Sequence, residues 1–393
     1  MLVMRRATLC SCLIALAAAC SSKWAPQEIS HLNDGEFHRE CAAVLPMASC
    51  SSLGIVTTRE LVPSIPTGQL FARGDGIDAY DAPALIHHFV LDGIPPRFRE
   101  NSTITLQPSP GANGSMATDG KSLFSCSTPY GLPIDERFRV WDSAARLTSE
   151  TFMSDDIPTY GCAVAGFQGL GLAVHSGNGF NTTYVFDSNG TIGYEHAGGF
   201  YSVQAVGYGC GFATFFGGVT FMPMDGRGQS NVTVDGVGYP LWALAFPWPP
   251  DPHAVAIVSI VPSTGFGDSD ASAPDGGTTM GRCSTLLALA FDDGRQYVKR
   301  SFDWACIAPA EGPFGLLNTS FGPVLNMGGG RLQLVDATAN PVGDVLQVDV
   351  GTPANTQFVA IGNHIVALST EGYPNSEFYE TVVGCLNPST GGR

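Results

Sequence analysis

Cysteine is the residue type with the widest chemistry in this chain, because a thiol can form a disulfide, bind a metal or act as a nucleophile. The chain has 11 cysteines among 393 residues, and eight of them follow residue 40. An even set is typical of disulfides in an exported protein, although sequence cannot choose among the many pairings. We expect up to four disulfides, with Cys41 to Cys50 and Cys283 to Cys306 as the local hypotheses. The candidates are Cys41, Cys50, Cys126, Cys162, Cys210, Cys283, Cys306 and Cys385.

Three aspartates could supply a second chemistry, the binding of a hard cation. Asp268, Asp270 and Asp275 lie in a segment rich in Gly, Ser, Ala and Pro, and alternating carboxylates on a flexible loop can wrap Ca²⁺. The segment does not fit the EF-hand spacing, and a solvated acidic loop is the alternative. A zinc site is disfavoured because the chain has no C-x-x-C pair. We therefore expect no cofactor, with Ca²⁺ at these aspartates as the one candidate cation.

Trp248 is the candidate ligand-binding residue. It lies in the proline-rich run Phe246–His253, FPWPPDPH, where the prolines stiffen the chain. A rigid indole on an exposed loop could stack on a sugar or a peptide. The alternative is that Trp248 covers the end of a sheet and serves only packing.

Catalytic motifs are missing, so we assign no catalytic residue. The chain has no G-x-S-x-G elbow, and no serine stands beside a recognisable His and Asp pair. A glycosidase needs only two carboxylates that face one cleft, which distant residues can supply in the fold. The carboxylates considered for that role are Asp155, Asp187, Glu195 and Asp225. We favour a protein that is not an enzyme and keep an extracellular, carboxylate-dependent hydrolase as the alternative.

The N-terminus has the order of an export signal. Arg5 and Arg6 precede a mostly apolar stretch, residues 7–19, which ends in small residues before Cys20. That stretch is too short to cross a hydrocarbon core, which needs about 20 residues. A buried helix of a cytosolic fold is the alternative.

The run Leu16-Ala17-Ala18-Ala19-Cys20 resembles the lipobox of bacterial lipoproteins. The resemblance implies that the Cys20 thiol receives a diacylglyceryl group and that the chain is cut before it, so that residues 1–19 are a signal peptide. Ala17 departs from the commonest lipobox, which has Leu at that position. Ser21, rather than Asp, implies the outer membrane. Residues 20–40 would then be a tether to a membrane outside the cytoplasm.

The charge balance excludes some partners. The chain has 19 Lys plus Arg against 35 Asp plus Glu, a net charge of −16. Such a surface repels nucleic acid and anionic lipid head groups. The partners we expect are the membrane, through the lipid anchor, and an envelope protein or glycan.

Short apolar or alternating runs, separated by Gly, Pro, Asn and Asp, predict an all-β fold. The motif Y-G-C-x-x-A occurs at residues 160–165 and 208–213. Turn-like sites recur at Phe186-Asp187, Met224-Asp225, Phe291-Asp292 and Val335-Asp336. The sequence D-G followed by a base, a tight-turn signal, occurs at Asp119-Gly120-Lys121, Asp225-Gly226-Arg227 and Asp293-Gly294-Arg295.

This spacing and turn chemistry resemble those of β-propeller proteins, without matching a named propeller family. The resemblance implies a propeller over residues 41–388 with about seven blades of 40 to 50 residues. One or two β-sandwich domains are the alternative. Together with the N-terminus, this predicts a membrane-anchored lipoprotein that acts as a binding or scaffolding module for a protein or glycan.

Overall fold

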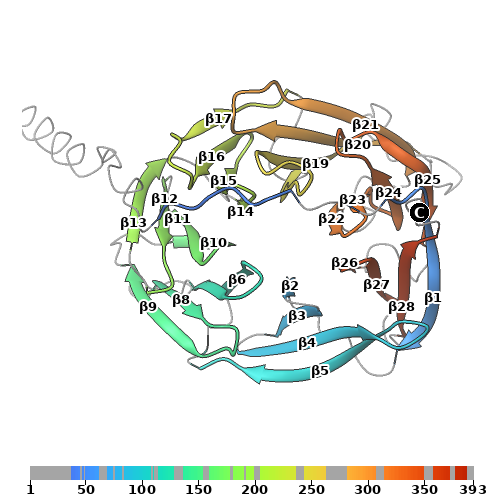
Figure 1. Cartoon of the computed structure of the whole chain (residues 1–393), viewed down its shortest axis with the longest axis horizontal. Helices are drawn as coiled ribbons and strands as arrows, with labels where there is room; N and C mark the ends of the chain where they lie inside the picture. The colour runs from blue at the N-terminus through green and yellow to red at the C-terminus, as the bar shows by residue number, and fades with distance from the viewer. Residues whose placement is uncertain are drawn as a thin grey trace, which may run out of the picture.

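The computed structural model shows a ring of small β-sheets (Figure 1). It describes residues 37–44, 47, 49–61, 69–73, 76–81, 84–107, 109, 114–127, 136–153, 159–177, 180–189, 192–198, 204–235, 243–262, 281–306, 314–348, 357–371 and 377–386. Their strands form seven four-stranded antiparallel sheets, the blades of a propeller. The predicted all-β propeller is confirmed, and the β-sandwich alternative is wrong. Within these ranges, no helix is both long and apolar enough to cross a membrane.

In each blade we call the strands a to d, from the axis outward. Blade 1 has β2 (Gln69–Arg73), β3 (Gly76–Asp81), β4 (Leu85–Asp92) and β5 (Arg97–Thr105), and blade 2 has β6 (Gly114–Thr118), β7 (Leu123–Ser127), β8 (Glu136–Trp141) and β9 (Leu147–Met153). Blade 3 has β10 (Thr159–Phe167), β11 (Leu170–Gly177), β12 (Phe180–Phe186) and β13 (Ile192–Gly198), and blade 4 has β14 (Gln204–Tyr208), β15 (Gly211–Phe215), β16 (Val219–Pro223) and β17 (Ser230–Val232). Blade 5 has β18 (Ala243–Pro247), β19 (Ala254–Pro262), β20 (Gly281–Phe291) and β21 (Val298–Cys306), and blade 6 has β22 (Gly315–Thr319), β23 (Gly322–Asn326), β24 (Arg331–Val335) and β25 (Pro341–Gln347).

Blade 7 closes the ring with strands from both ends of the chain. Its strands a to c are β26 (Gln357–Ile361), β27 (His364–Glu371) and β28 (Glu377–Cys385), and its outermost strand is β1 (Leu53–Leu61). β1 pairs antiparallel with β28, and Leu53 lies opposite Cys385. A disulfide between Cys50 and Cys385 fixes this junction. The first and last strands are therefore held together by backbone hydrogen bonds and by a covalent bond.

The core lies between the blades rather than inside one central layer. Seven clusters of buried apolar residues each join two neighbouring blades. Strand β19 shows the principle, because Ala256 and Val258 pack toward blade 6 while Val255 and Ile257 pack toward blade 4. Side chains alternate across a strand, so a strand buried on both faces reads as a continuous apolar run. This explains the run AVAIVSIV in the sequence.

An aspartate begins the c–d turn of six blades: Asp92, Asp142, Asp187, Asp225, Asp292 and Asp336. In four of these turns the carboxylate accepts a hydrogen bond from the backbone N–H two residues further on. Such side-chain caps replace backbone bonds that a tight turn leaves unmade. Gly120, Gly226 and Gly294 follow aspartates with φ of 90°, 88° and 81°, a region that favours glycine. The predicted turn at each D-G-base site is thus confirmed.

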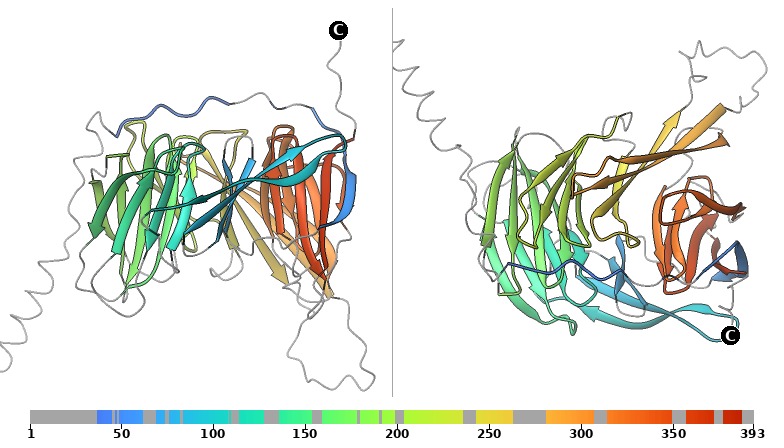
Figure 2. Two further views of the ribbon diagram at one scale, coloured as in Figure 1. Left: turned by 90° about the horizontal axis from the view of Figure 1, so that it is seen from below. Right: turned by 45° about the horizontal axis from the view of Figure 1, so that its top comes forward.

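The N-terminal segment crosses one face of the ring. Because neighbouring strands are antiparallel, the a–b and c–d connections all lie on one face, and we call it the strap face. The described part of residues 37–50, which we call the strap, runs along it (Figure 2, left). Phe37 is buried between blades 3 and 4, and the backbone N–H of Arg39 donates to the Met224 carbonyl at 2.6 Å. Residues 37–40, which the sequence assigned to the tether, therefore lie against the ring.

We expect Asp336→Asn to lower the free energy of unfolding at neutral pH by more than it does in acid. The carboxylate of Asp336 accepts bonds from the N–H groups of Thr338 and Asn340, both at 2.8 Å. Burial alone would raise its pKa, but these hydrogen bonds outweigh burial and lower the pKa of Asp336. A carboxylate with a lowered native pKa stabilises the fold above its unfolded pKa, and the contribution is lost as the pH falls through the native pKa.

Urea unfolding from about pH 7 to about pH 2 measures this difference between variant and unmodified protein. Asp344→Asn is the matched control, because it makes the same charge change on an exposed residue of the adjacent strand β25. A difference for Asp336→Asn that stays constant over this pH range would contradict the prediction.

Candidate functional site

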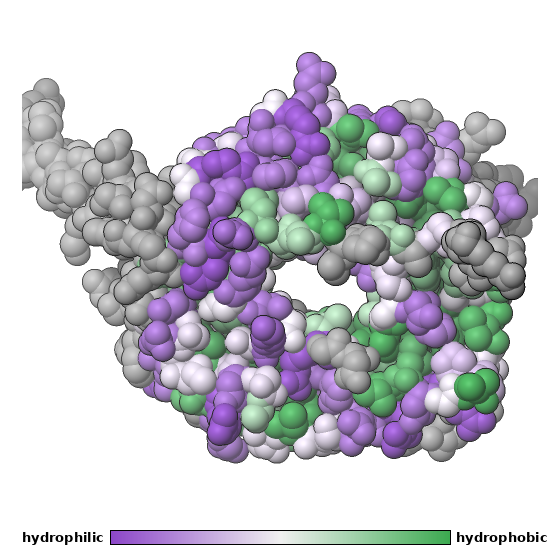
Figure 3. All heavy atoms as spheres, in the orientation of Figure 1, coloured by the Kyte–Doolittle hydropathy of each residue, from purple (hydrophilic) through white to green (hydrophobic). Residues whose placement is uncertain are grey.

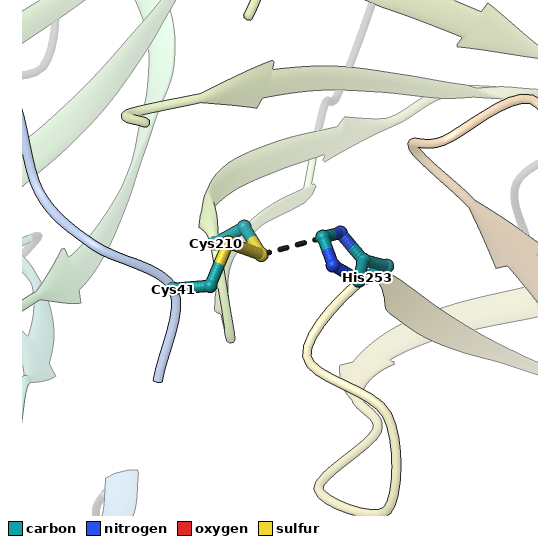
Figure 4. Close-up of side chains that lie close together, drawn as sticks. All are labelled: Cys41, Cys210 and His253. Atoms are coloured by element: carbon teal, nitrogen blue, oxygen red, sulfur yellow. Dashed lines mark hydrogen bonds between the residues drawn. A yellow bond between two sulfur atoms is a disulfide. The ribbon is translucent and has the colours of Figure 1, made fainter. Parts of the chain in front are cut away.

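The strap meets blades 4 and 5 at a cluster of chemically active side chains. Cys41 on the strap is bonded to Cys210 in the a–b turn of blade 4. His253, at the end of the a–b connection of blade 5, places its Nδ1 3.4 Å from the Cys210 Sγ (Figure 4). One ligand atom from each residue lies within 4.8 Å of the other two. Among the residues described, this is the only such group of three potential metal ligands.

The Asp292 side chain contacts His253 and two further residues, Tyr208 and Arg227. Its side chain is fully buried, and it begins the c–d turn of blade 5. The Tyr208 hydroxyl donates to Oδ2 at 2.6 Å, and the Arg227 guanidinium donates to both oxygens at 2.8 and 2.9 Å. The His253 Nδ1 lies 2.9 Å from Oδ1. Paired and bidentate partners of this kind compensate a buried carboxylate for its lost hydration.

The doubled aspartate in Phe291-Asp292-Asp293 frees Asp292 for this role. In blades 2, 3, 4 and 6 the aspartate after strand c caps its own turn, but in blade 5 Asp293 does so by accepting from the Arg295 N–H at 3.2 Å. Asp292 can therefore point inward toward the neighbouring blade. Arg227 reaches it from the D-G-R turn of blade 4, where it also donates to Asp225 at 2.7 Å.

The protonation states of Tyr208 and Arg227 are fixed by their surroundings. Burial, followed by the hydrogen bond to Asp292, raises the pKa of Tyr208 far above its usual range. Burial opposes the charge of Arg227, but hydrogen bonds to Asp292 and Asp225 outweigh it and raise the pKa of Arg227. The phenol therefore stays protonated and the guanidinium stays charged under all ordinary conditions.

While Cys41 and Cys210 are bonded to each other, the cluster links the strap to blades 4 and 5 and cannot act as a metal or acyl-transfer centre. Metal ligation and nucleophilic attack by cysteine both need the thiolate, which Cys41 and Cys210 lack while they are bonded to each other. A catalytic triad needs the nucleophile and the acid on opposite nitrogens of the histidine. Here Cys210 and Asp292 both contact Nδ1 of His253.

A second cluster also pairs a buried aspartate with an arginine and a histidine, without cysteine or tyrosine. Asp78 in β3 is fully buried and pairs with Arg73, and its Oδ1 lies 2.6 Å from the His88 Nδ1. Arg73 also donates to the Ser143 carbonyl of blade 2 at 2.8 Å. A buried aspartate with an arginine and a histidine therefore occurs between two different pairs of blades. The cluster at Asp292 differs in having Tyr208, partners from two blades and the disulfide.

The structure places Trp248 in the core. Its relative exposure is 1 %, and it packs in the cluster between blades 5 and 6. The expectation of an indole on an exposed loop is therefore wrong, and the alternative of packing at the end of a sheet fits the structure. The two prolines that follow stiffen the connection. Burial of the large indole ring against blade 6 lowers the free energy more than an exposed position would.

The predicted disulfides are present, but the predicted local partner of Cys41 is not the one in the structure. The described bonds are Cys41–Cys210, Cys50–Cys385 and Cys126–Cys162. The hypothesis that Cys41 pairs with Cys50 is wrong, because the strap carries them to different blades. Cys283 is also disulfide-bonded, but the side chain of Cys306 lies outside the description, so their pairing stays a prediction.

Other predicted sites lie outside the described residues. These are the lipidation site Cys20 and the candidate Ca²⁺ ligands Asp268, Asp270 and Asp275.

Of the carboxylates considered for hydrolysis, Asp187 and Asp225 have described side chains. Asp187 caps its own turn, Asp225 pairs with Arg227, and Glu195 lies on the outermost strand of blade 3 opposite Tyr184. Asp155 lies outside the described residues. Within the described side chains, Asp187 and Asp225 are therefore each engaged in their own turn.

Sequence reasoning missed Tyr208, Arg227, His253 and Asp292 as one group. Tyr208 ends strand β14 and the other three lie in three different connections, so residues that meet between blades have no fixed spacing in the sequence. The one signal in the sequence was the second aspartate in Asp292-Asp293, because a single aspartate suffices to cap the turns of the other blades.

We expect Asp292→Asn to destabilise the fold by about 2 kcal/mol. Loss of one buried partner leaves the other charge uncompensated, which costs about 3–5 kcal/mol in full burial, and the one-third exposure of Arg227 reduces that cost. Urea unfolding at neutral pH checks the value. Asp293→Asn is the control in the same turn, with an expected loss below about 1 kcal/mol. Equal losses for the two variants would contradict the role of Asp292.

Comparison with known proteins finds no family model that matches the chain and no curated protein that is similar to it in sequence. A propeller ring serves many unrelated functions, so the fold does not name an activity. The functional argument therefore rests on the chain's own residues.

Proposed function

We propose that this protein is an exported lipoprotein, anchored through Cys20, that binds a protein partner of the cell envelope. The observation that carries the binding role is a set of exposed aliphatic residues where the ring closes. We call this set the closure patch: Ile55, Val56, Val345 and Leu386, which are 45, 42, 46 and 56 % exposed.

The patch residues lie around the junction of blades 6 and 7, on β1, on β25 and directly after β28. The Leu386 side chain lies over Gly54, and the Val56 side chain lies beside Gly384. Gly343, two residues before Val345, abuts the Ser51 carbonyl. Apolar residues gather on this side of the ring, near β26 to β28 (Figure 3). Contiguous exposed apolar surface marks interaction sites on soluble domains.

The composition of the patch favours a protein over a glycan. Sugars are recognised by stacking on exposed aromatic rings, and the large apolar residues that are exposed in the described chain are all aliphatic. Aliphatic surface instead buries well against the apolar core of a protein interface. The net charge of −16 adds a bias toward a partner with basic residues around that core.

Two features support the location. The disulfides described here form and persist in oxidising compartments. The strap is also bonded to the ring at both Cys41 and Cys50, so a pull on the N-terminus is transmitted to the whole ring. From Cys20 to Phe37 the chain can span at most about 60 Å, which keeps the ring close to the membrane.

The anchor predicts a definite mass. We expect the protein purified from membranes in detergent to begin at Cys20 and to carry added acyl mass, because the thiol is the acceptor of the lipid. Intact-mass spectrometry measures this, and Cys20→Ser should yield a chain without acyl mass that leaves the membrane fraction. Cys10→Ser is the control and should be processed normally. An unmodified chain that retains residues 1–19 would contradict the anchor.

The closure patch predicts contact with a partner at defined positions. We expect a photo-crosslinking amino acid at Val56 or Leu386 to give one discrete protein adduct in illuminated cells, because these side chains lie inside the patch. Ile94, which is fully exposed in the c–d turn of blade 1, is the control position and should give none.

Val345→Glu should abolish the adduct at Val56, whereas Ile94→Glu should leave it unchanged. Thermal unfolding of both variants shows whether the ring is intact. Equal adducts at the patch and at Ile94, or none at the patch, would contradict the proposal.

A further inference from the structure

The Cys41–Cys210 disulfide is the one described disulfide with cationic or imidazole nitrogens beside its sulfurs. The His253 Nδ1 lies 3.4 Å from the Cys210 Sγ. The Cys41 Sγ lies 3.3 Å from an Asp225 carboxylate oxygen and 3.9 Å from the Arg227 Nη2, which also donates to Asp292. By contrast, the recorded contacts of Cys50 and Cys162 are with backbone carbonyls, at 3.2 and 4.0 Å. Thiolates are stabilised by neighbouring histidine and arginine and not by carbonyl oxygens.

The two sulfurs also differ in access. Cys210 is fully buried, whereas Cys41 on the strap is partly exposed. Thiol–disulfide exchange needs an attacking thiolate to reach one sulfur while the other leaves. An external thiol therefore reaches Cys41, and the leaving sulfur is that of Cys210, beside His253.

We propose that Cys41–Cys210 is a thiol-exchange site, at which an external dithiol attacks Cys41 and releases Cys210. In the first step the thiolate of the dithiol bonds to the Cys41 Sγ, the disulfide breaks, and Cys210 leaves as a thiolate. In the second step the other thiol of the dithiol attacks its own mixed-disulfide sulfur and releases Cys41. The dithiol is oxidised to a disulfide, and Cys41 and Cys210 are each reduced and take up one proton.

His253 is a positioning residue for the leaving sulfur. Its Nδ1 sits 2.9 Å from Oδ1 of the buried Asp292, and because a carboxylate oxygen accepts, this contact keeps a hydrogen on Nδ1, the ring nitrogen that also lies 3.4 Å from the Cys210 Sγ. A hydrogen bond to charge is stronger than one to a neutral sulfur, so this contact gains strength as the Cys210 thiolate forms. Exchange speeds up when the leaving thiolate is stabilised.

Opening of this bond would leave the strap attached to the ring by its other contacts. Phe37 would keep its packing between blades 3 and 4, and Ala42 would keep its hydrogen bond to the Gly209 carbonyl at 2.6 Å. Cys50–Cys385 would still hold the far end and the ring closure. The site thus exchanges electrons without opening the propeller.

The test treats the folded, oxidised protein with limiting dithiothreitol, blocks new thiols with iodoacetamide, and maps the blocked cysteines by mass spectrometry. We expect Cys41–Cys210 to open roughly tenfold faster than Cys50–Cys385 or Cys126–Cys162. Glutathione, a monothiol, should give a mixed disulfide on Cys41 and not on Cys210. Opening of all disulfides at one rate, or an adduct on Cys210, would overturn the proposal.

His253→Ala separates positioning from packing. We expect it to slow the opening of Cys41–Cys210 by roughly threefold to tenfold. If His253 only held the structure together, its loss would expose the bond and speed the opening, which would overturn the assigned role. His88→Ala is the matched control, because His88 pairs with a buried aspartate in the cluster that lacks cysteine, and it should leave the rate unchanged.

Discussion

The fold depends on one constraint, which is that no blade can bury both of its faces alone. Every apolar cluster joins two blades, so each blade needs a neighbour on both sides and the ring must close. Full closure removes this difficulty by giving each sheet two neighbours. β1 supplies the last strand of blade 7, and Cys50–Cys385 makes that pairing permanent. The strap lies on the face that carries the a–b and c–d turns, and it is bonded to the ring at Cys41 and at Cys50.

The cluster at Asp292 follows from the same constraint. A carboxylate between blades 4 and 5 has no access to water, so its partners must come from both blades: Tyr208 and Arg227 from one, His253 from the other. This cross-blade sharing brings an imidazole to the sulfur of Cys210 and gives the disulfide a polar environment. The cluster at Asp78 shows that a buried aspartate can be paired with an arginine and a histidine where no cysteine is present. The proposed thiol exchange at Cys41–Cys210 is therefore not needed for the structural role of such a cluster.

Sequence was informative wherever the physics is local. The turn after strand c has a capping carboxylate in blades 2 to 6 and often a glycine, so Met224-Asp225 or Asp293-Gly294 could be recognised and their period indicated blades. The burial of Trp248 could not be predicted from the sequence. A stiff loop can point the indole ring outward or inward, and the direction depends on the packing against the neighbouring blade. Disulfide partners such as Cys41 and Cys210 were equally out of reach, because their closeness depends on where the strap crosses the ring.

The disulfide pattern has a consequence for the order of events during synthesis. Cys41 and Cys50 are separated from their partners by 169 and 335 residues, whereas they lie close to each other in the sequence. In a chain that emerges N-terminus first, these two thiols meet long before Cys210 or Cys385 exists to receive them. The nearest pairing is thus the non-native one, and native bonds require that it be prevented or exchanged after the last strand arrives. The Cys50–Cys385 bond, which closes the ring, can form only after the last strand has been made.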